Sequence, residues 1–422
     1  MADSRVRYRV LLLTFITAFI MYIDRVCIGT AAPTIREEFG FDKVTMGWIF
    51  SAFSCGYMLF QIPGGWAADK YGPRKILTLS MLWWSIFTAA TATALNAWSM
   101  AIYRFLFGVG EAAAFPTASR SLVRWLPIGR RAFGQGFQHA GSRLGAAVTP
   151  PIVVVMIAYF GWRSVFYSFA IIGGLWALLW YWYYRDYPED HRGVNRAELE
   201  VLKLIGFEGK AESRQRVPWS KILRSRNLWA LSLMYFCYGW VLWIYLAWLP
   251  TYLKDERGFT LIKMGIAASI PLLAATATNM LGGWFSDSLV RRLGDLRRGR
   301  LSVSIIGFSI AGLGLIPGAV VADATTALVC LTFALAGLEL TVAVSWAICL
   351  DIGGEFSGSV SSVMNTLGNL GGFFSSIVVA YLATQFNWAV PFLVAAGLCV
   401  SAALIATQID PRRSVVGEGV RP

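Results

Sequence analysis

Six charged side chains of this sequence stand inside long apolar stretches, where a charge is expensive. They are Asp24, Arg25, Arg104, Glu111, Arg143 and Glu339, and His139 is a polar neighbour. A charged residue at the centre of a membrane-spanning helix costs about 2.5–3.5 kcal/mol on insertion scales. A chain retains such residues where they face a cavity or a partner, so we expect its chemistry at these positions.

Arg25 is suited to binding an anion. Its planar guanidinium can hold a carboxylate by two parallel hydrogen bonds, and unlike a lysine it stays charged at membrane depth. Tyr22 lies three residues earlier, on the same helical face. The alternative role is a structural ion pair with Asp24 or Glu111. Adjacent residues diverge by about 100° around a helix, so Asp24 and Arg25 cannot share one face.

Asp24 and Glu111 are candidate proton carriers. A carboxyl balanced between desolvation and a neighbouring guanidinium can load and release a proton near neutral pH, which proton coupling requires. The alternative is that one of them belongs to a permanent ion pair. Arg104 lies seven residues before Glu111, two turns along the same face, so it is expected to be the partner of Glu111 or a gate residue.

Other chemistries find no support in the sequence. The six cysteines form no CxxC pair and only two His are present, so we expect free thiols, no metal site and no cofactor besides the proton. They are Cys27, Cys55, Cys237, Cys330, Cys349 and Cys399. No nucleophile–base cluster is visible, so we do not expect an enzyme. Gly108 and Gly110 follow no strand and indicate helix packing.

The composition indicates that these residues are positioned by membrane helices. Of 422 residues, 56% are hydrophobic and 14% are charged, against about 45–50% and 25% in soluble domains. A spanning helix needs about 20 mostly apolar residues. The twelve candidate spans are approximately 9–31, 45–67, 76–95, 98–119, 132–160, 162–184, 227–252, 261–287, 301–321, 324–350, 358–383 and 388–408.

Lysine and arginine predict the orientation of these spans. With the N-terminus in the cytoplasm, 28 of the 37 basic residues lie in inner segments and six lie in outer loops, while Arg25, Arg104 and Arg143 lie in the membrane. The net charge of +13 therefore reflects topology, and no nucleic-acid partner is expected. Both termini and segment 185–226 should be cytoplasmic.

Segment 185–226 is the one long polar stretch, and it separates six expected spans from six others. Asn195 followed by Glu198 resembles a helix N-cap with its acid at N3. Leu199, Leu202 and Ile205 then form an apolar stripe, which favours a short helix on the inner membrane surface. We expect a bundle over 1–184, a linker with an amphipathic helix over 185–226, a bundle over 227–410 and a tail over 411–422.

The two halves repeat one pattern. Gly64–Asp69 (GGWAAD) ends the second span and Gly282–Asp287 (GGWFSD) ends the eighth, and a basic cluster follows each. A parallel repeat of this kind is typical of secondary transporters. The segment 65–75 (GWAADKYGPRK) resembles the loop 2–3 signature of the major facilitator superfamily, and 104–110 (RFLFGVG) resembles the span-four signature of that superfamily.

Further motifs resemble the anion:cation symporter branch of that superfamily. They are 22–25 (YIDR), Glu111 with Phe115–Pro116, 248–253 (WLPTYL) and 365–369 (NTLGN). The branch includes hexuronate and galactonate importers and vesicular glutamate and sialic acid carriers. The resemblance implies that Arg25 binds the substrate anion and that Asp24 and Glu111 serve proton coupling.

The resemblance also implies further site residues. Those expected near the substrate are Tyr22, Tyr57, Ser142, Arg143, Ser345, Trp346, Asn365 and Asn369. Asp69 and Asp287 are expected in an inward-closing gate, paired with loop arginines or a helix N-terminus. This chain departs from the branch at Ser142–Arg143, where sugar-acid carriers often have a Gln in place of Ser142, and at Glu339. Arg143 is either the structural partner of Glu111 or Glu339, or a second anchor for the anion.

Together these features predict an all-α membrane protein with twelve transmembrane helices in two pseudo-symmetric six-helix bundles. We expect a monomer in the lipid bilayer of the inner (cytoplasmic) membrane. Its expected function is proton-coupled uptake of a small organic anion by alternating access. An organic-anion exchanger or exporter of the same fold is the alternative. A membrane sensor is not expected, because no soluble output domain is visible.

Overall fold

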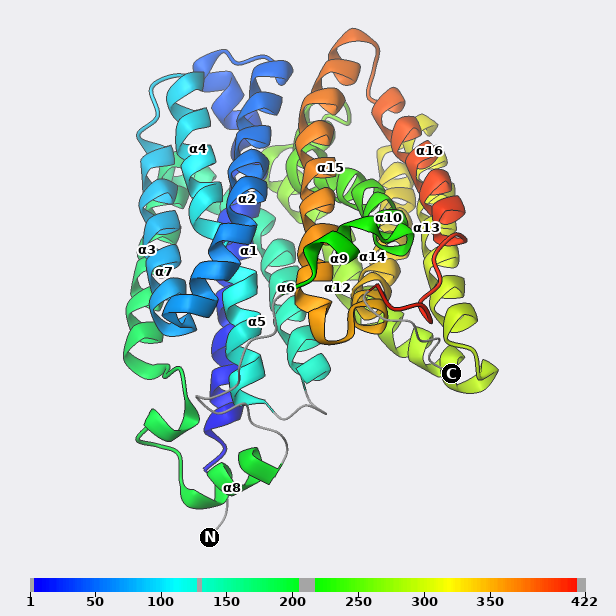
Figure 1. The fold of residues 1–422 in the computed structure, drawn as a ribbon. Coiled ribbons are helices and arrows are strands. Elements are labelled where there is room, and N and C mark those ends of the chain that lie inside the picture. Colours follow the sequence, from blue (N-terminus) through cyan, green and yellow to red (C-terminus); the bar gives the residue numbers. More distant parts are fainter. Residues whose placement is uncertain (1–3, 127–130, 205–216, 416–422) are drawn as a thin grey trace.

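The computed structural model describes residues 4–126, 131–204 and 217–415, and within them the chain is helical and contains no strand (Figure 1). The helices of the first half and the linker are α1 (Val6–Phe39), α2 (Lys43–Tyr71), α3 (Pro73–Ala92), α4 (Ala97–Glu111), α5 (Ala114–Trp125), α6 (Arg131–Phe160), α7 (Trp162–Tyr183), η2 (Pro188–Asp190), α8 (Arg196–Leu204) and α9 (Trp219–Arg224). Those of the second half are α10 (Arg226–Trp243), η3 (Ile244–Trp248), α11 (Leu249–Asp255), α12 (Leu261–Leu293), α13 (Leu296–Val320), α14 (Ala324–Gly353), η4 (Gly354–Phe356), α15 (Ser357–Gln385) and α16 (Ala389–Ala406).

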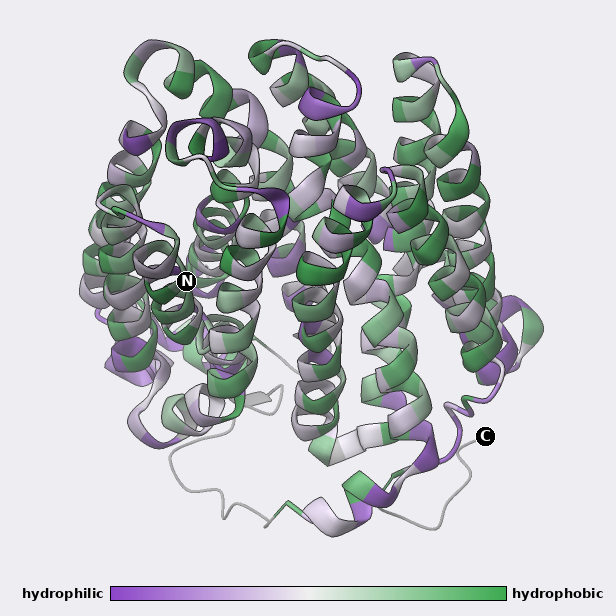
Figure 2. Ribbon diagram, turned by 90° about the horizontal axis from the view of Figure 1, so that it is seen from above, coloured by the Kyte–Doolittle hydropathy of each residue, from purple (hydrophilic) through white to green (hydrophobic). Residues whose placement is uncertain are grey.

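Nine spans in the described ranges are long and apolar enough to cross a membrane. They are α1, α6, α7, the run α10–η3–α11, and α12 to α16. Large apolar side chains remain exposed along the helices, for example Leu79, Ile86 and Leu175, and Figure 2 shows how widely apolar residues cover them. Lipid can solvate such a surface, whereas water would not. The all-helical membrane fold is confirmed, and the count of twelve crossings stays a prediction.

The helices form two groups that meet along a long contact. In the first group α1 packs against α6, α2 against α4 and α3 against α7. In the second, α10 packs against α15, and α13 packs against both α14 and α16. Between the groups, α6 packs against α12 and α2 against α15, so each side of the central region is closed by one helix from each half (Figure 1).

Ion pairs join the two halves at the end where the α1–α2 turn lies. Arg36 Nη1 lies 2.7 Å from Asp255 Oδ2, and Lys254 Nζ lies 2.6 Å from Glu37 Oε1. The helices also touch there, because a Cβ at Gly29 would stand 2.3 Å from the carbonyl oxygen of Leu246. We call this end the outer end, following the orientation that the basic residues predict.

Glycines allow the closest helix contacts within each half. A Cβ at Gly108 of α4 would lie 2.3 Å from the Phe53 carbonyl oxygen of α2. A Cβ at Gly239 of α10 would lie 2.0 Å from the Gly368 carbonyl oxygen of α15. Any larger residue would push these backbones apart. The interpretation of Gly108 as a helix-packing residue is confirmed.

Two of the expected spans are interrupted. The sequence predicts one helix over 98–119, but α4 ends at Glu111 and α5 begins at Ala114. Pro116 lacks the N–H that would bond the carbonyl of Ala112, which weakens the helix at that point. Likewise, span seven contains the π-helical turn η3, and Pro250 cannot bond the carbonyl of Leu246 within it. Irregular turns of this kind often occur at functional positions.

The linker is attached to the start of α1. Asn195 Oδ1 accepts from the Glu198 backbone N–H at 3.0 Å, which confirms the N-cap of α8. The carboxylate of Glu198 turns toward α1, where it accepts from the backbone N–H groups of Val6 and Arg7 at 3.0 and 2.9 Å. Leu202 is buried by the protein itself, and Ile205 lies outside the described residues. The division of the chain at 184/185 and 226/227 stays our interpretation.

Candidate functional site

A pocket lies between the two halves and has about 590 Å³ of empty space, including the part that is open to solvent. Seven of the nine residues that the sequence predicts near the substrate line it: Tyr22, Arg25, Tyr57, Arg143, Trp346, Asn365 and Asn369. The wall also contains residues that the sequence did not assign to substrate, among them Phe115, His139, Tyr235, Tyr238 and Trp243.

Arg25 is paired with Glu111 at one side of this pocket. The Nη2 and Nε atoms of Arg25 donate to Glu111 Oε2 at 2.7 and 3.1 Å. The other carboxylate oxygen, Oε1, is buried and has no hydrogen-bond partner among the described residues. The sequence left a pair of Arg25 with Glu111 open, and the structure has that pair. One oxygen of the carboxylate is thus engaged and the other is left without a donor.

Aromatic rings surround the Arg25 guanidinium. Its Cζ lies 4.7 Å from the ring centroid of Tyr22, 5.0 Å from that of Phe53 and 4.8 Å from that of Tyr57. Ring faces attract the cation and keep water away from it. The guanidinium is therefore held between α1 and α2 with its charge directed at Glu111 and the pocket.

Asp24 and Arg104 lie behind this wall and neither lines the pocket. Both carboxylate oxygens of Asp24 are buried without a hydrogen-bond partner among the described residues, and so are Nε and Nη1 of Arg104. Arg104 lies over the rings of Phe107 and Phe53, at 4.1 and 5.3 Å. Of the two roles expected for Arg104, the ion pair with Glu111 is not formed, because Glu111 turns to Arg25, and the gate role stays a prediction. The prediction that Asp24 and Arg25 point to different faces is confirmed.

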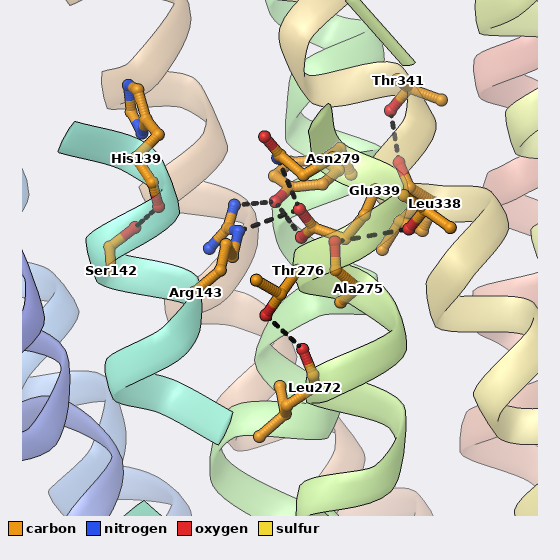
Figure 3. A network of polar contacts seen from close by, with 12 residues as sticks. His139, Ser142, Arg143, Leu272, Ala275, Thr276, Asn279, Leu338, Glu339 and Thr341 are labelled. Carbon is orange, nitrogen blue, oxygen red and sulfur yellow. Dashed lines mark hydrogen bonds and ion pairs between the residues drawn. The ribbon is translucent and has the colours of Figure 1, made fainter. Parts of the chain in front are cut away.

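Arg143 joins the two halves across the pocket (Figure 3). Its Nε donates to Glu339 Oε2 of α14 at 2.9 Å, and its Nη2 donates to the hydroxyl of Tyr238 at 2.8 Å. Tyr238 in turn donates to Glu339 Oε1 at 2.8 Å, and Asn279 of α12 donates to Oε2 at 2.9 Å. Of the two partners that the sequence offered for Arg143 within the protein, the structure selects Glu339.

Several expected polar residues bond their own helix. Ser142 donates to the His139 carbonyl at 2.7 Å and Ser345 to the Thr341 carbonyl at 2.8 Å, and neither serine lines the pocket. Asn369 donates to the Asn365 carbonyl at 2.8 Å. The Asn365 and Asn369 side chains are on the pocket wall and offer amide groups to a ligand.

His139 and Trp346 complete an aromatic side of the pocket. His139 stacks on Phe115 with ring centroids 5.1 Å apart, and its centroid lies 5.2 Å from that of Trp346 in the other half. The Trp346 indole N–H donates to the Tyr235 hydroxyl at 3.1 Å. Apart from the rings that the family resemblance implies, the aromatic content of the chain is too high for a single ring to be assigned from sequence. Tyr235 was therefore not predicted, and Phe115 was named only as part of a family motif. Asn279 is the third hydrogen-bond donor to Glu339. Its amide inside an apolar run of the sequence was the one feature that could have predicted it.

Of the two expected gate residues, the structure describes the side chain of Asp287 but not that of Asp69. Asp287 accepts from Arg300 Nη1 at 2.7 Å, and Arg300 Nε also reaches Asp351 Oδ2 at 3.0 Å. This is the pairing with a nearby arginine that the sequence predicts, while the gating role stays a prediction. The side chain of Asp69 lies outside the described residues. In the first half, Asp186 accepts from the Arg74 backbone N–H at 3.0 Å, at the start of α3.

The described part of the chain contains no group of three or more His, Cys, Asp or Glu side chains that could hold a metal ion. The polar groups that line the pocket are instead two guanidiniums, an imidazole, tyrosine hydroxyls and amides, and each guanidinium is paired with a buried carboxylate. The guanidiniums of this set can bind an anion, and the carboxylates paired with them can take up protons.

Comparison with known proteins places this geometry in a family. Residues 14–376 match the model of the Major Facilitator Superfamily. The chain is 37% identical over 412 residues to a probable sulfoacetate transporter of Cupriavidus necator, covering 97% of this chain and 95% of that protein. It is 33% identical to a D-galactonate transporter of Escherichia coli (92% and 91% covered) and 30% identical to a hexuronate transporter of Bacillus subtilis (98% and 97% covered).

A solved structure has the same fold. It is that of a bacterial homologue of the human lysosomal transporter Spinster, in an inward-facing and unoccupied conformation. The TM-score is 0.76 at 16% identity, with 95% of this chain and 96% of that chain covered. The two long groups of helices around a central pocket are thus an arrangement already known in membrane transport.

Proposed function

The chain belongs to the major facilitator superfamily, in its organic-anion branch, and from this premise we propose that it imports a small organic anion together with protons. It is a multi-pass membrane transporter and not an enzyme. The names of its relatives suggest carboxylates and sulfonates as substrates: sulfoacetate, D-galactonate and hexuronates.

The observation that carries this proposal is the Arg25–Glu111 pair at the pocket wall. While Glu111 is ionised it occupies Arg25, and a second anion in the site would be repelled by it. Protonation of Glu111 removes that competitor and leaves the Arg25 guanidinium free to bind the substrate carboxylate. Binding of the anion and uptake of the proton therefore favour each other, which is the thermodynamic requirement for symport.

Asp24 is the proposed proton relay for Glu111. Its carboxylate is buried and makes no hydrogen bond within the described residues, and Glu111, Arg104 and the indole of Trp84 lie near it. A buried carboxylate without a donor is strongly disfavoured, whereas a neutral carboxyl is tolerated. Asp24 is therefore suited to hold the proton that Glu111 gives up.

We propose that the carrier works by alternating access between its two halves. The ion pairs Arg36–Asp255 and Lys254–Glu37 close the outer end, so the described state would receive or release substrate on the inner side. Twelve crossings, cytoplasmic termini and a location in the inner membrane complete this proposal, and the monomer is its functional unit. Reporter fusions within 185–226 test the topology, and an external reporter there would contradict it.

Transport itself can be measured in proteoliposomes that contain the purified full-length protein. With an acidic exterior, sulfoacetate or D-galactonate should accumulate above the external concentration, and a protonophore should abolish the accumulation. The alternative function, anion exchange, predicts uptake that ignores the pH gradient and is accelerated by anion inside the vesicles. The second outcome would reject symport.

A further inference from the structure

A second buried pair of an arginine and a glutamate lies at the pocket, and its glutamate, unlike Glu111, is hydrogen-bonded on both oxygens. Arg143 lines the pocket and donates to Glu339, as Arg25 lines it and donates to Glu111. In both pairs the carboxylate is fully buried and the guanidinium is almost so, with 7% and 6% of the arginine side chains exposed. The second pair differs in that it connects α6 of one half to α14 of the other (Figure 3).

Glu339 has a hydrogen-bond donor on each oxygen besides Arg143, because Tyr238 donates to Oε1 and Asn279 to Oε2. Its titratable and charged neighbours are Arg143 of α6 and Tyr238 and Tyr235 of α10, with Tyr22 of α1 beyond Arg143. From α12, Asn279 donates an amide hydrogen to it. The neighbouring α13 packs on α14 at Gly307 and Ile310, which are not titratable, and α15 contributes the amides of Asn365 and Asn369 to the pocket.

Tyr22 brings the two cations within reach of one small molecule. Its ring centroid lies 4.7 Å from Arg25 Cζ and 5.7 Å from Arg143 Cζ, and its hydroxyl accepts from Arg143 Nη1 at 3.4 Å. A compact molecule bound against Tyr22 therefore meets a guanidinium at each end. A single carboxylate can engage only one of them as its direct partner.

We propose that Arg143 is a second anion anchor and Glu339 its exchangeable partner, so that the site takes a compact dianion together with two protons. This inference rests on the proposed function. In the empty site two guanidiniums face two carboxylates, and the charges cancel. When a dianion replaces both carboxylates as the partner of the arginines, protonation of Glu111 and Glu339 leaves the same net charge in the site. No uncompensated charge then has to cross the low-dielectric interior when the halves move.

A matched pair of probes tests the second anchor. Sulfoacetate carries two charges, and carbamoylmethanesulfonate replaces its carboxylate by an isosteric neutral amide. Binding of each to the purified full-length protein is measured by calorimetry. The parent should prefer the dianion about tenfold or more, as expected for charge-assisted hydrogen bonds. Arg143→Gln should lose this preference, whereas Arg163→Gln, which removes a half-exposed arginine at the outer end, should keep it.

The double variant Arg143→Gln/Glu339→Gln separates binding from folding. Removing Arg143 alone leaves Glu339 buried without its cation and should lower the melting temperature, and removing both charges should restore it. If Arg143 is an anchor, the restored protein still fails to prefer the dianion. If the double variant recovers the preference of the parent, the pair is structural and the proposal is overturned.

Proton counting tests the role of Glu339. Calorimetry in buffers of different ionisation enthalpy gives the number of protons taken up with each dianion. We expect two for the parent and one for Glu339→Gln, and an unchanged number would overturn the exchange role of Glu339. A parent that binds both probes equally well refutes the second anchor and leaves the proposed function standing. A parent that binds D-galactonate but neither probe overturns this inference alone, and a parent that binds none of the three anions refutes the proposed function as well.

Discussion

Arg25 of α1 donates two hydrogen bonds to one and the same oxygen of Glu111 of α4, at 2.7 and 3.1 Å. The second oxygen of Glu111 is buried and finds no donor in the described part of the chain. An ionised carboxylate with one unpaired oxygen is costly in that environment, and protonation of that oxygen removes the charge that makes it costly. The asymmetry fits a carboxyl that exchanges its proton at the free oxygen while the other one faces the arginine.

Replacing Glu111 by glutamine should separate exchange from accumulation. The neutral amide imitates the protonated carboxyl, so Arg25 is free and the loaded carrier can still change conformation. We expect counterflow of labelled substrate to remain, while accumulation driven by a pH gradient falls to equilibrium. Both are measured in proteoliposomes. If Glu111→Gln accumulates substrate as well as the parent does, Glu111 is not a coupling residue and Asp24 must carry that role alone.

Replacing Arg25 by lysine should weaken substrate binding without removing the charge. Lysine lacks the planar fork and cannot donate two parallel hydrogen bonds to a carboxylate. The expected loss is about 1.5–3 kcal/mol, the range for hydrogen bonds to charged groups. Calorimetric titration of the purified variant measures it. Equal affinity of Arg25→Lys and the parent would argue against a two-bond contact between Arg25 and the anion.

A larger residue at Gly29 should open the outer end. A Cβ there would lie 2.3 Å from the Leu246 carbonyl oxygen of η3, so Gly29→Leu forces α1 away from the second half. Spin labels at Leu95 and Phe386, both exposed at the outer end, should report a longer distance in this variant. Gly174→Leu is the matched control, because no atom lies within 4 Å of a Cβ at Gly174. An unchanged distance in Gly29→Leu would contradict closure at this contact.

Glu198 of α8 should stabilise the start of α1. Glu198 accepts from two backbone N–H groups in the first turn of α1, which have no partner within the helix itself. Glu198→Ala should therefore cost about 1–2 kcal/mol, as the loss of an N-cap does, and lower the melting temperature. Glu200→Ala, which removes an exposed acid of the same helix, should have little effect. Equal melting temperatures of the two variants would contradict the cap.

His191 should make the stability of the linker region depend on pH. Burial, followed by the nearby Arg185, lowers the pKa of His191, and its Nδ1 accepts from the Gly193 N–H at 3.0 Å, which requires the neutral ring. The folded state thus resists protonation, so stability is complete above the unfolded pKa of about 6.5 and falls as the pH drops below it.

Melting curves between pH 7.5 and 5.5 measure this effect, in a window set by the ordinary histidine pKa of about 6.5. The parent should lose stability toward the acidic end, and His191→Gln should show a smaller loss. If the two proteins follow the same pH dependence, the contact of His191 with Gly193 and the rings of Trp125 and Tyr183 does not control protonation.

The sequence by itself determined the class of the protein and the identity of its costly residues. Long apolar runs can only be solvated by lipid, and charges within them stand out because their insertion is expensive. Helix periodicity also determined which side chains of one helix share a face, since Asp24 and Arg25 are about 100° apart around the helix axis whatever surrounds them. These conclusions depend on local chemistry, so no knowledge of the packing was needed.

Only the tertiary structure decided which charges meet. Arg25 pairs with Glu111, 86 residues away, and Arg143 pairs with Glu339, 196 residues away in the other half. Arg104, although on the same helix as Glu111 and spaced by two turns, lies against Phe107 and Phe53 instead. The choice depends on where the packing of the bundle places α1 relative to α4 and α6 relative to α14, and on the breaks next to Pro116 and Pro250. Helix packing sets these distances, and no spacing along the chain encodes them.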